Sequence, residues 1–329
     1  MIRLSIRTVS ALALLALSVP ALQAVAQQDV PPAPAQEPAP SGPAPAAAPV
    51  FPKPDPANFT AVSPTKEAIN GFLQTAWGYD DTRIWQVQAI LKTPVDGVSK
   101  AVVLIADKAG KQKPAVLQFF VLPDGKHIIA GDEVVPFGEH PYADYRALVQ
   151  QRADGPYRGS ALKDLEIVEF ADFQCPHCKE AQANMDKLVT DFPKARIIFQ
   201  NYPLPQHTAA ANAAAYGICV AKQGGSTAFF TFSSAVFEGQ DGLATTDGAT
   251  LTLNSAVTKA GLDPAKIAAC SSEPATKAVV DASVKLAQDL SINQTPTLVI
   301  NGRQVPANAP YDTLKQIVLY QIKLDGLAQ

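Results

Sequence analysis

Two cysteines separated by two residues, Cys175 and Cys178, constrain this chain more than any other feature. The apolar run from Leu165 to Phe170 precedes them, and a stretch with helical character follows from Lys179. We therefore expect a β-strand, a turn and a helix, with Cys175 near the helix N-terminus. Unpaired backbone N–H groups and the positive end of the helix dipole favour a thiolate at that place. A thiolate is the form of cysteine that attacks disulfides.

The neighbouring residues separate the uses that a Cys-x-x-Cys motif can have. A structural zinc site needs four ligands, normally from a second closely spaced pair, whereas Cys219 and Cys270 are isolated. A c-type haem site needs a histidine directly after the second cysteine, where this chain has Lys179. A purely structural disulfide is the remaining alternative, but the strand-to-helix context is typical of a redox site. We therefore predict redox chemistry, with no metal and no cofactor.

Two segments of the chain together point to one family. Residues Glu169 to Cys178 read Glu-Phe-x-x-Phe-x-Cys-Pro-His-Cys, which resembles the active-site segment of the disulfide-bond protein A (DsbA) family of thioredoxin-like oxidoreductases. Residues Gln294 to Gly302 are similar to the cis-proline loop and the following strand of the same superfamily. Both motifs occur in the order expected of that superfamily, and the resemblance covers about residues 160–329.

The resemblance implies an α/β, thioredoxin-like fold at residues 158–329, with a helical insertion at about 208–290. Before it, one helix and an antiparallel meander of strands predict a small α+β domain at residues 59–157. The hairpin from Asp124 to Ile129 is similar to one in the N-terminal domain of DsbC-type disulfide isomerases, which makes dimers in that family. A generic hairpin turn is the alternative explanation of the same residues.

The first residues of the chain predict export. Arg3 and Arg7 form a short basic region, and Ala11 to Val19 form an apolar core. Ala24 to Ala26 then make a small-x-small cleavage site, so residues 1–26 read as a secretory signal peptide. An uncleaved membrane anchor is the alternative, which the proline directly after the apolar core disfavours.

A stretch rich in proline and alanine follows at residues 27–58. It holds eleven of the chain's 28 prolines. Proline fixes the backbone and lacks an N–H group, so we predict an extended linker there, without helix or sheet.

Charge and export determine which partners we expect. A net charge of −3 gives no electrostatic case for nucleic acid. Export implies the periplasm, an oxidising compartment where disulfides persist. The resemblance implies unfolded or partly oxidised exported proteins as substrates, a membrane redox partner of unknown identity, and a homodimer through the N-terminal domain as one arrangement.

The resemblance also implies roles for individual residues in thiol–disulfide exchange. Cys175 is expected to be the exposed, attackable sulfur, with Cys178 buried one helical turn inward. His177 is expected to donate a hydrogen bond or a partial positive charge to the Cys175 thiolate, while Pro176 restricts the start of the helix. Glu169 stands where the family has an acidic residue and is expected to move protons to or from Cys178. A solvated charge on an edge strand is the alternative for this glutamate.

The second motif supplies the expected substrate-binding residues. Pro296 is expected to be cis and packed against the disulfide, with the Thr295 backbone offering β-type hydrogen bonds to an extended substrate. A trans proline in an ordinary turn is the alternative. Thr295 departs from the valine usual in the oxidase prototype and is similar to the threonine of isomerases and of some DsbA-like proteins. Asp172 falls in the turn before Cys175 and is a poorer acid–base candidate than the strand glutamate.

The other two cysteines, Cys219 and Cys270, are expected to form a structural disulfide that pins the helical insertion. Two buried free thiols are the alternative.

Three functions follow from these features. The first is an exported enzyme, a thiol:disulfide oxidoreductase that introduces disulfides through Cys175 and Cys178. A dimeric disulfide isomerase or reductase is the second, suggested by Thr295 and the extra domain. The third is a periplasmic binding or chaperone module that keeps the fold without turnover.

Overall fold

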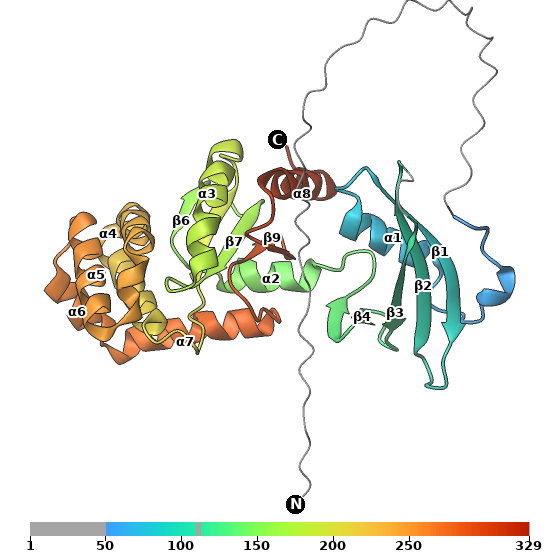
Figure 1. Cartoon of the computed structure of the whole chain (residues 1–329), viewed down its shortest axis with the longest axis horizontal. Coiled ribbons are helices and arrows are strands. Elements are labelled where there is room, and N and C mark those ends of the chain that lie inside the picture. The colour runs from blue at the N-terminus through green and yellow to red at the C-terminus, as the bar shows by residue number, and fades with distance from the viewer. Residues whose placement is uncertain (1–50, 110–112, 329) are drawn as a thin grey trace, which may run out of the picture. The chain divides into compact units, whose positions relative to one another are not determined.

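The computed structural model describes residues 51–109 and 113–328 (Figure 1). The predicted signal peptide at residues 1–26 and most of the predicted linker lie outside the described residues.

The described part of the linker contains a short helix. The 3-10 helix η1 spans Pro56–Asn58, and the Asp55 side chain accepts a hydrogen bond of 2.9 Å from the Ala57 N–H group. The prediction that residues 27–58 lack helix is therefore wrong at this point. An aspartate cap followed by a proline in the first turn favours a helix start, even in a proline-rich segment.

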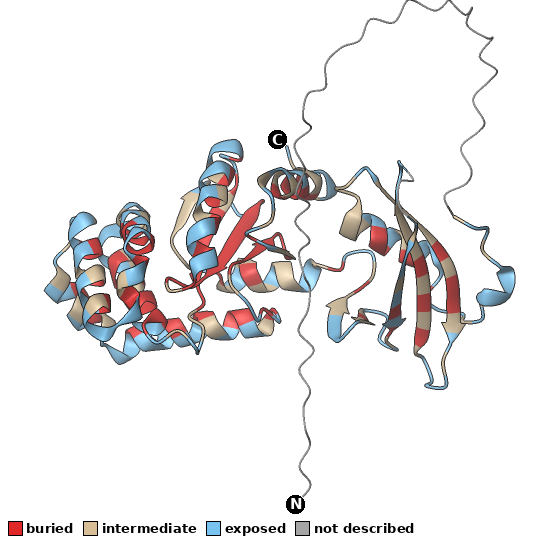
Figure 2. Cartoon of the chain, in the orientation of Figure 1, coloured by how far each residue is buried: buried red, intermediate tan, exposed pale blue. Residues whose placement is uncertain are grey.

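One helix and a five-stranded antiparallel sheet follow along the chain. Each strand pairs with its neighbour in sequence, in the order β1-β2-β3-β4-β5. The elements are α1 Lys66–Trp77, β1 Arg83–Lys92, β2 Ser99–Asp107, β3 Ala115–Val121, β4 His127–Ala130 and β5 Glu133–Pro136. Buried side chains of α1, such as Phe72, pack in one cluster with Val103 and Phe119 of the sheet. Buried residues alternate along β2, as expected for a sheet with one covered face (Figure 2). The sequence predicted the helix and the meander but missed β5.

The second sheet contains the strand that leads to the Cys-x-x-Cys motif. Its order is β10-β9-β7-β8-β6. The strands are β6 Tyr157–Gly159, β7 Glu166–Ala171, β8 Arg196–Asn201, β9 Thr297–Ile300 and β10 Arg303–Pro306. Parallel strands β7 and β8 are joined by α3, Pro176–Asp191, while β9 pairs with β7 and β10 in antiparallel fashion. A parallel β-α-β unit followed by an antiparallel hairpin in one sheet is a thioredoxin-like fold, as predicted.

Helices between β8 and β9 form the insertion. They are α4 Ala210–Glu238, the 3-10 helix η2 Gln240–Ala244, α5 Thr246–Lys259, α6 Pro264–Ser271 and α7 Pro274–Asp289. Helix α4 bends at Gly225, whose φ of 73° lies in the region that favours glycine. Among the described residues, no helix is both long and apolar enough to span a membrane.

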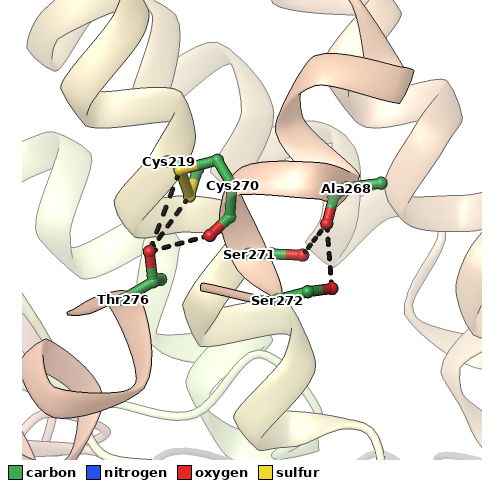
Figure 3. Close-up of a disulfide and its surroundings, with 6 residues drawn as sticks. All are labelled: Cys219, Ala268, Cys270, Ser271, Ser272 and Thr276. Atoms are coloured by element: carbon green, nitrogen blue, oxygen red, sulfur yellow. Dashed lines mark hydrogen bonds between the residues drawn. A yellow bond between two sulfur atoms is a disulfide. The ribbon is translucent and has the colours of Figure 1, made fainter. Parts of the chain in front are cut away.

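A disulfide fastens the insertion. It joins Cys219 in α4 to Cys270 in α6 across 51 residues (Figure 3). The Thr276 hydroxyl lies 3.6 and 3.8 Å from the two sulfurs and donates a hydrogen bond of 2.8 Å to the Cys270 carbonyl oxygen. The two cysteines that were expected to pair are therefore bonded to each other.

Helices cover both faces of the second sheet. On one face, α3 and the closing helix α8, Tyr311–Leu324, pack in a cluster with Ile167 of β7. On the other face, α2, Ala143–Arg152, and α7 pack in a cluster with Val168 of the same strand. Neighbouring residues of a strand point to opposite faces, so β7 is buried along its whole length (Figure 2). The motif therefore follows directly from a strand in the centre of the domain.

Candidate active site

Cys175 and Cys178 lie at the N-terminus of α3, a few residues after the carboxyl end of β7. Cys175 is the N-cap residue, and Pro176 occupies the first turn. Proline suits this position because its fixed φ is helical and it has no N–H group to leave unpaired. The Cys175 carbonyl oxygen accepts hydrogen bonds from the N–H groups of Cys178 at 3.1 Å and Lys179 at 3.3 Å. Both cysteines are free thiols in this structure.

The two cysteines are buried to different degrees. Cys178 is 0% exposed and Cys175 is 5% exposed. The expectation of an exposed Cys175 is therefore wrong in degree, because Thr295 and Gln240 both contact this residue. Of the pair, Cys175 alone retains any exposure, so it is the sulfur that an incoming thiolate can reach.

The environment of the two sulfurs separates their acidities. The pKa of Cys175 is lowered to about 5, chiefly because Cys178 hydrogen-bonds to its sulfur. Burial opposes this shift, while the Thr295 side chain and the backbone N–H groups of Cys178 and His177 add to it. Burial raises the pKa of Cys178 far above the ordinary thiol value, and its hydrogen bond to Cys175 raises it further. Cys175 is therefore a thiolate at neutral pH, whereas Cys178 is a thiol.

The His177 side chain takes only one of its two expected roles. Its Nδ1 atom lies 3.0 Å from the Glu180 carboxylate, and its side chain is 61% exposed. The Glu180 hydrogen bond is the main reason why the pKa of His177 is raised. The prediction that the imidazole donates to the Cys175 sulfur is therefore not met here, because Glu180 lies one helical turn further along α3. His177 acts on Cys175 through its backbone N–H group and its charge.

Glu169 is a buried carboxyl in the central strand. It is 2% exposed, so the alternative of a solvated edge charge is wrong. The Gln182 amide in α3 donates hydrogen bonds to the Glu169 carboxylate at 2.9 Å and to the Cys178 carbonyl oxygen at 3.1 Å. Burial is the main reason why the pKa of Glu169 is raised to about 7. This carboxyl can therefore hold or release a proton near neutral pH.

The second motif closes the site from β9. The peptide bond between Thr295 and Pro296 is cis. The Cys175 sulfur lies 3.6 Å from the Thr295 carbonyl oxygen. The structure thus confirms the predicted cis proline and places the Thr295 carbonyl oxygen beside the reactive sulfur.

Two glutamines that the sequence did not single out join the insertion to the active-site loop. The Gln240 amide in η2 donates to the carbonyl oxygens of Phe173 at 2.8 Å and Cys175 at 2.9 Å. Gln174 accepts from the Ala209 N–H group at 2.8 Å and donates to a carbonyl oxygen of η2. A glutamine has no motif that marks such a role, so only the structure shows it.

The fold and the paired cysteines define a thioredoxin-fold domain with a Cys-x-x-Cys site and a helical insertion before the cis-proline loop. The family model described as "Thioredoxin" matches residues 152–319. The chain belongs to this family.

Curated relatives match only part of the chain. It is 28% identical over 156 residues to the Na(+)/H(+) antiporter NhaA 3 of Salinispora tropica, covering 47% of this chain and 22% of that protein. It is 36% identical over 47 residues to the Na(+)/H(+) antiporter NhaA 1 of Salinispora arenicola, covering 14% of this chain and 7% of that protein. The chain thus spans about a fifth or less of the length of the curated relatives it matches.

Solved structures resemble about half of the chain. A thioredoxin-like oxidoreductase from Silicibacter pomeroyi is 24% identical, with 54% of this chain and 98% of that chain covered and a TM-score of 0.46. DsbA2 from Pseudomonas aeruginosa is 28% identical, with 51% and 93% covered and a TM-score of 0.44. The catalytic domain of ScsC from Proteus mirabilis is 21% identical, with 54% and 98% covered and a TM-score of 0.45.

Proposed function

We propose that this protein is exported to the periplasm and introduces disulfides into other exported proteins. The observation that carries the proposal is the difference between the two cysteines, with the pKa of Cys175 lowered to about 5 and that of Cys178 raised. Stabilising the Cys175 thiolate stabilises the reduced form of the protein, which makes its disulfide a strong oxidant.

The reaction would begin with the oxidised Cys175–Cys178 pair. A substrate thiolate attacks the Cys175 sulfur, and a mixed disulfide forms as the bond between the two cysteines breaks. The electron pair goes to the Cys178 sulfur, which takes a proton from the buried Glu169 carboxyl. With a pKa of about 7, Glu169 holds such a proton at neutral pH in an appreciable fraction of molecules.

The second step releases the product. A second thiol of the substrate, once deprotonated, attacks the substrate sulfur of the mixed disulfide and expels Cys175 as a thiolate. The substrate dithiol is thereby oxidised to a disulfide, and the protein is left with the Cys175 thiolate and the Cys178 thiol. The thiolate of Cys175 is a good leaving group because its pKa is low. Reoxidation would require a membrane redox partner.

Thr295 and the sheet-containing region before the redox domain favour a second candidate, a disulfide isomerase or reductase. An isomerase would cleave wrong disulfides with reduced Cys175, in a homodimer built through residues 59–150. Oxidation remains the first proposal because the thiolate at Cys175 favours the reduced product.

Reduced and scrambled forms of one disulfide-containing substrate protein, given side by side to the full chain, test these proposals. The oxidised chain is expected to oxidise the reduced substrate rapidly, with little unscrambling by the reduced chain. Preferential unscrambling would select the isomerase. If neither substrate reacts, and Cys175→Ala leaves binding of unfolded protein intact, the protein is a binding or chaperone module.

Export is tested separately. Expression of the full chain with its first residues should give a periplasmic protein whose mature N-terminus is Gln27. Recovery of the intact N-terminus in the membrane fraction would contradict cleavage.

A further inference from the structure

Asp172 is the residue whose backbone touches both cysteines. Its N–H group donates a hydrogen bond of 3.4 Å to the Cys178 sulfur. Its carbonyl oxygen accepts a hydrogen bond of 3.1 Å from the Cys175 N–H group. The position of the Asp172 backbone therefore bears directly on the environment of both cysteines.

The Asp172 side chain is fully buried and accepts three hydrogen bonds. One comes from the Gln174 N–H group at 2.7 Å, within the active-site loop. The other two come from the segment that leads to α4, from the Leu204 N–H group at 2.8 Å and from His207 Nδ1 at 2.8 Å. A carboxylate only accepts hydrogen bonds, so the contact with His207 uses the tautomer in which Nδ1 is the donor.

His207 is the side chain among these donors, so it is the one that a substitution can remove. Its side chain is 22% exposed, while the carboxylate beneath it is fully buried. If His207 loses its ring nitrogen, the backbone donors Gln174 and Leu204 still hold the carboxylate. The fold can therefore survive the change, while one constraint on the position of Asp172 is lost.

The Asp172 N–H group matters most while the Cys178 sulfur leaves. In the proposed first step that sulfur takes the electron pair of the broken disulfide, in a site where burial raises its pKa. A fixed N–H donor aimed at an atom where negative charge develops stabilises that charge, as backbone donors do for oxyanions. The hydrogen bond from Asp172 acts in that direction, because it lowers the pKa of Cys178 against the larger effect of burial.

We propose that Asp172 and His207 form a positioning pair, which holds the Asp172 N–H group against the Cys178 sulfur and so speeds disulfide cleavage. The proposal rests on the thiol–disulfide exchange proposed above. His207 has no hydrogen bond to either sulfur, and its effect passes through the carboxylate and the backbone N–H group of Asp172.

Three substitutions at one position separate this role from a general packing role. In His207→Asn the amide nitrogen stands as many bonds from Cα as Nδ1 does, so it can donate to the same carboxylate. In His207→Gln the amide nitrogen lies one bond further out, and His207→Ala has no donor. The asparagine variant should therefore cleave its disulfide like the wild type, whereas the glutamine and alanine variants should both be slower.

The test measures cleavage of the Cys175–Cys178 disulfide in the oxidised full chain by reduced glutathione, under pseudo-first-order conditions. His207→Ala and His207→Gln should slow cleavage by about three- to tenfold, the range expected from the loss of one hydrogen bond near the reacting atom. His207→Asn should stay within about twofold of the wild type. The rate of alkylation of Cys175 in the reduced chain should stay within about twofold of the wild-type rate in all variants, because the Cys175 thiolate depends on other donors. If His207→Ala does not fold, His207→Gln provides the comparison.

Wild-type cleavage rates in the alanine and glutamine variants would overturn the proposal. An asparagine variant as slow as the alanine variant would also overturn it, as would an equal fall in cleavage and alkylation. If glutathione does not cleave the wild-type disulfide at all, the proposed function itself fails, which is a distinguishable result.

Discussion

The carbonyl oxygen of Thr295 lies 3.6 Å from the sulfur of Cys175, although the two residues are 120 positions apart in the sequence. The helical insertion lies between them along the chain, and the second sheet brings them together because β9 pairs with β7. The reactive sulfur is thus set between a helix N-terminus and the loop before β9. Backbone N–H groups at the helix N-terminus and the Thr295 side chain both lower the pKa of Cys175.

The first prediction concerns the acidity of Cys175. In the reduced chain, the rate of its alkylation by iodoacetamide should rise with pH around a midpoint near 5. Thr295→Val should move this midpoint upward, and Cys178→Ala should move it further, because Cys178 is the larger cause of the low pKa. The measurement is the pH–rate profile of the three proteins. A midpoint at the ordinary thiol value in the wild type would contradict the proposed thiolate.

The second prediction concerns the buried carboxyl of Glu169. The unfolded chain releases this proton near the ordinary pKa of 4.5, whereas the folded chain releases it near 7. Between these values the folded state binds more protons, so the free energy of unfolding falls as the pH rises. The full difference corresponds to roughly 3 kcal/mol. Glu169→Gln should therefore be more stable than the wild type at pH 8, by up to about this amount, and gain much less near pH 4.5.

Urea denaturation of the reduced forms at several pH values checks this prediction. Glutamine keeps the shape of the side chain and can still accept from Gln182, so packing changes little. Stability curves that run parallel for the two proteins between pH 4.5 and 8 would show that Glu169 does not titrate in this range.

The sequence predicts an element of this structure well where the residues of that element alone determine it, and poorly where a contact with a distant segment does. The strand β7 and the start of α3 follow from a mainly apolar segment and from Pro176 at the first helical turn. The short strand β6 carries little pattern of its own, because three residues are too few for an alternation. It forms by pairing with β8, a contact that lies far away in the sequence.

The same distinction holds within the site. Cys175 and Glu169 were recognised because the motif itself fixes their positions in the strand and helix. Asp172 was underrated as a turn residue, since its partner His207 lies 35 residues away. The motif predicts a hydrogen bond or a partial positive charge from His177 to the sulfur, but it does not show that Glu180, one helical turn along α3, binds the imidazole. Contacts between distant segments and competition among polar partners are what a motif cannot show.

The third prediction concerns the disulfide in the insertion. The double variant Cys219→Ser/Cys270→Ser should lower the free energy of unfolding by about 4 kcal/mol, the value of the chain-entropy model for a loop of this length. Replacing both residues avoids leaving one reactive thiol. Urea denaturation of wild type and variant, both with the Cys175–Cys178 pair reduced, measures the difference. A loss below about 1 kcal/mol would show that the insertion does not depend on this bond.

The fourth prediction concerns Gln240. Its substitution by alanine removes two hydrogen bonds to carbonyl oxygens of the active-site loop. The free energy of unfolding should therefore fall by about 1–3 kcal/mol. Gln223 in α4 is exposed and serves as the matched control, for which alanine should change stability by less than about 0.5 kcal/mol. Equal effects at the two positions would mean that the contact between η2 and the loop contributes nothing specific.

The most direct measurement is a single turnover. The oxidised full chain is mixed with an equimolar reduced peptide that carries two cysteines, and both are analysed by mass spectrometry after acid quenching. We predict that the peptide loses two hydrogen atoms while the protein gains two. When the oxidised peptide is given to Cys178→Ala instead, the Cys175 thiolate should attack the peptide disulfide, form a mixed disulfide and release the second peptide sulfur as a thiol. An unchanged peptide beside a still oxidised Cys175–Cys178 pair would contradict the proposed oxidation.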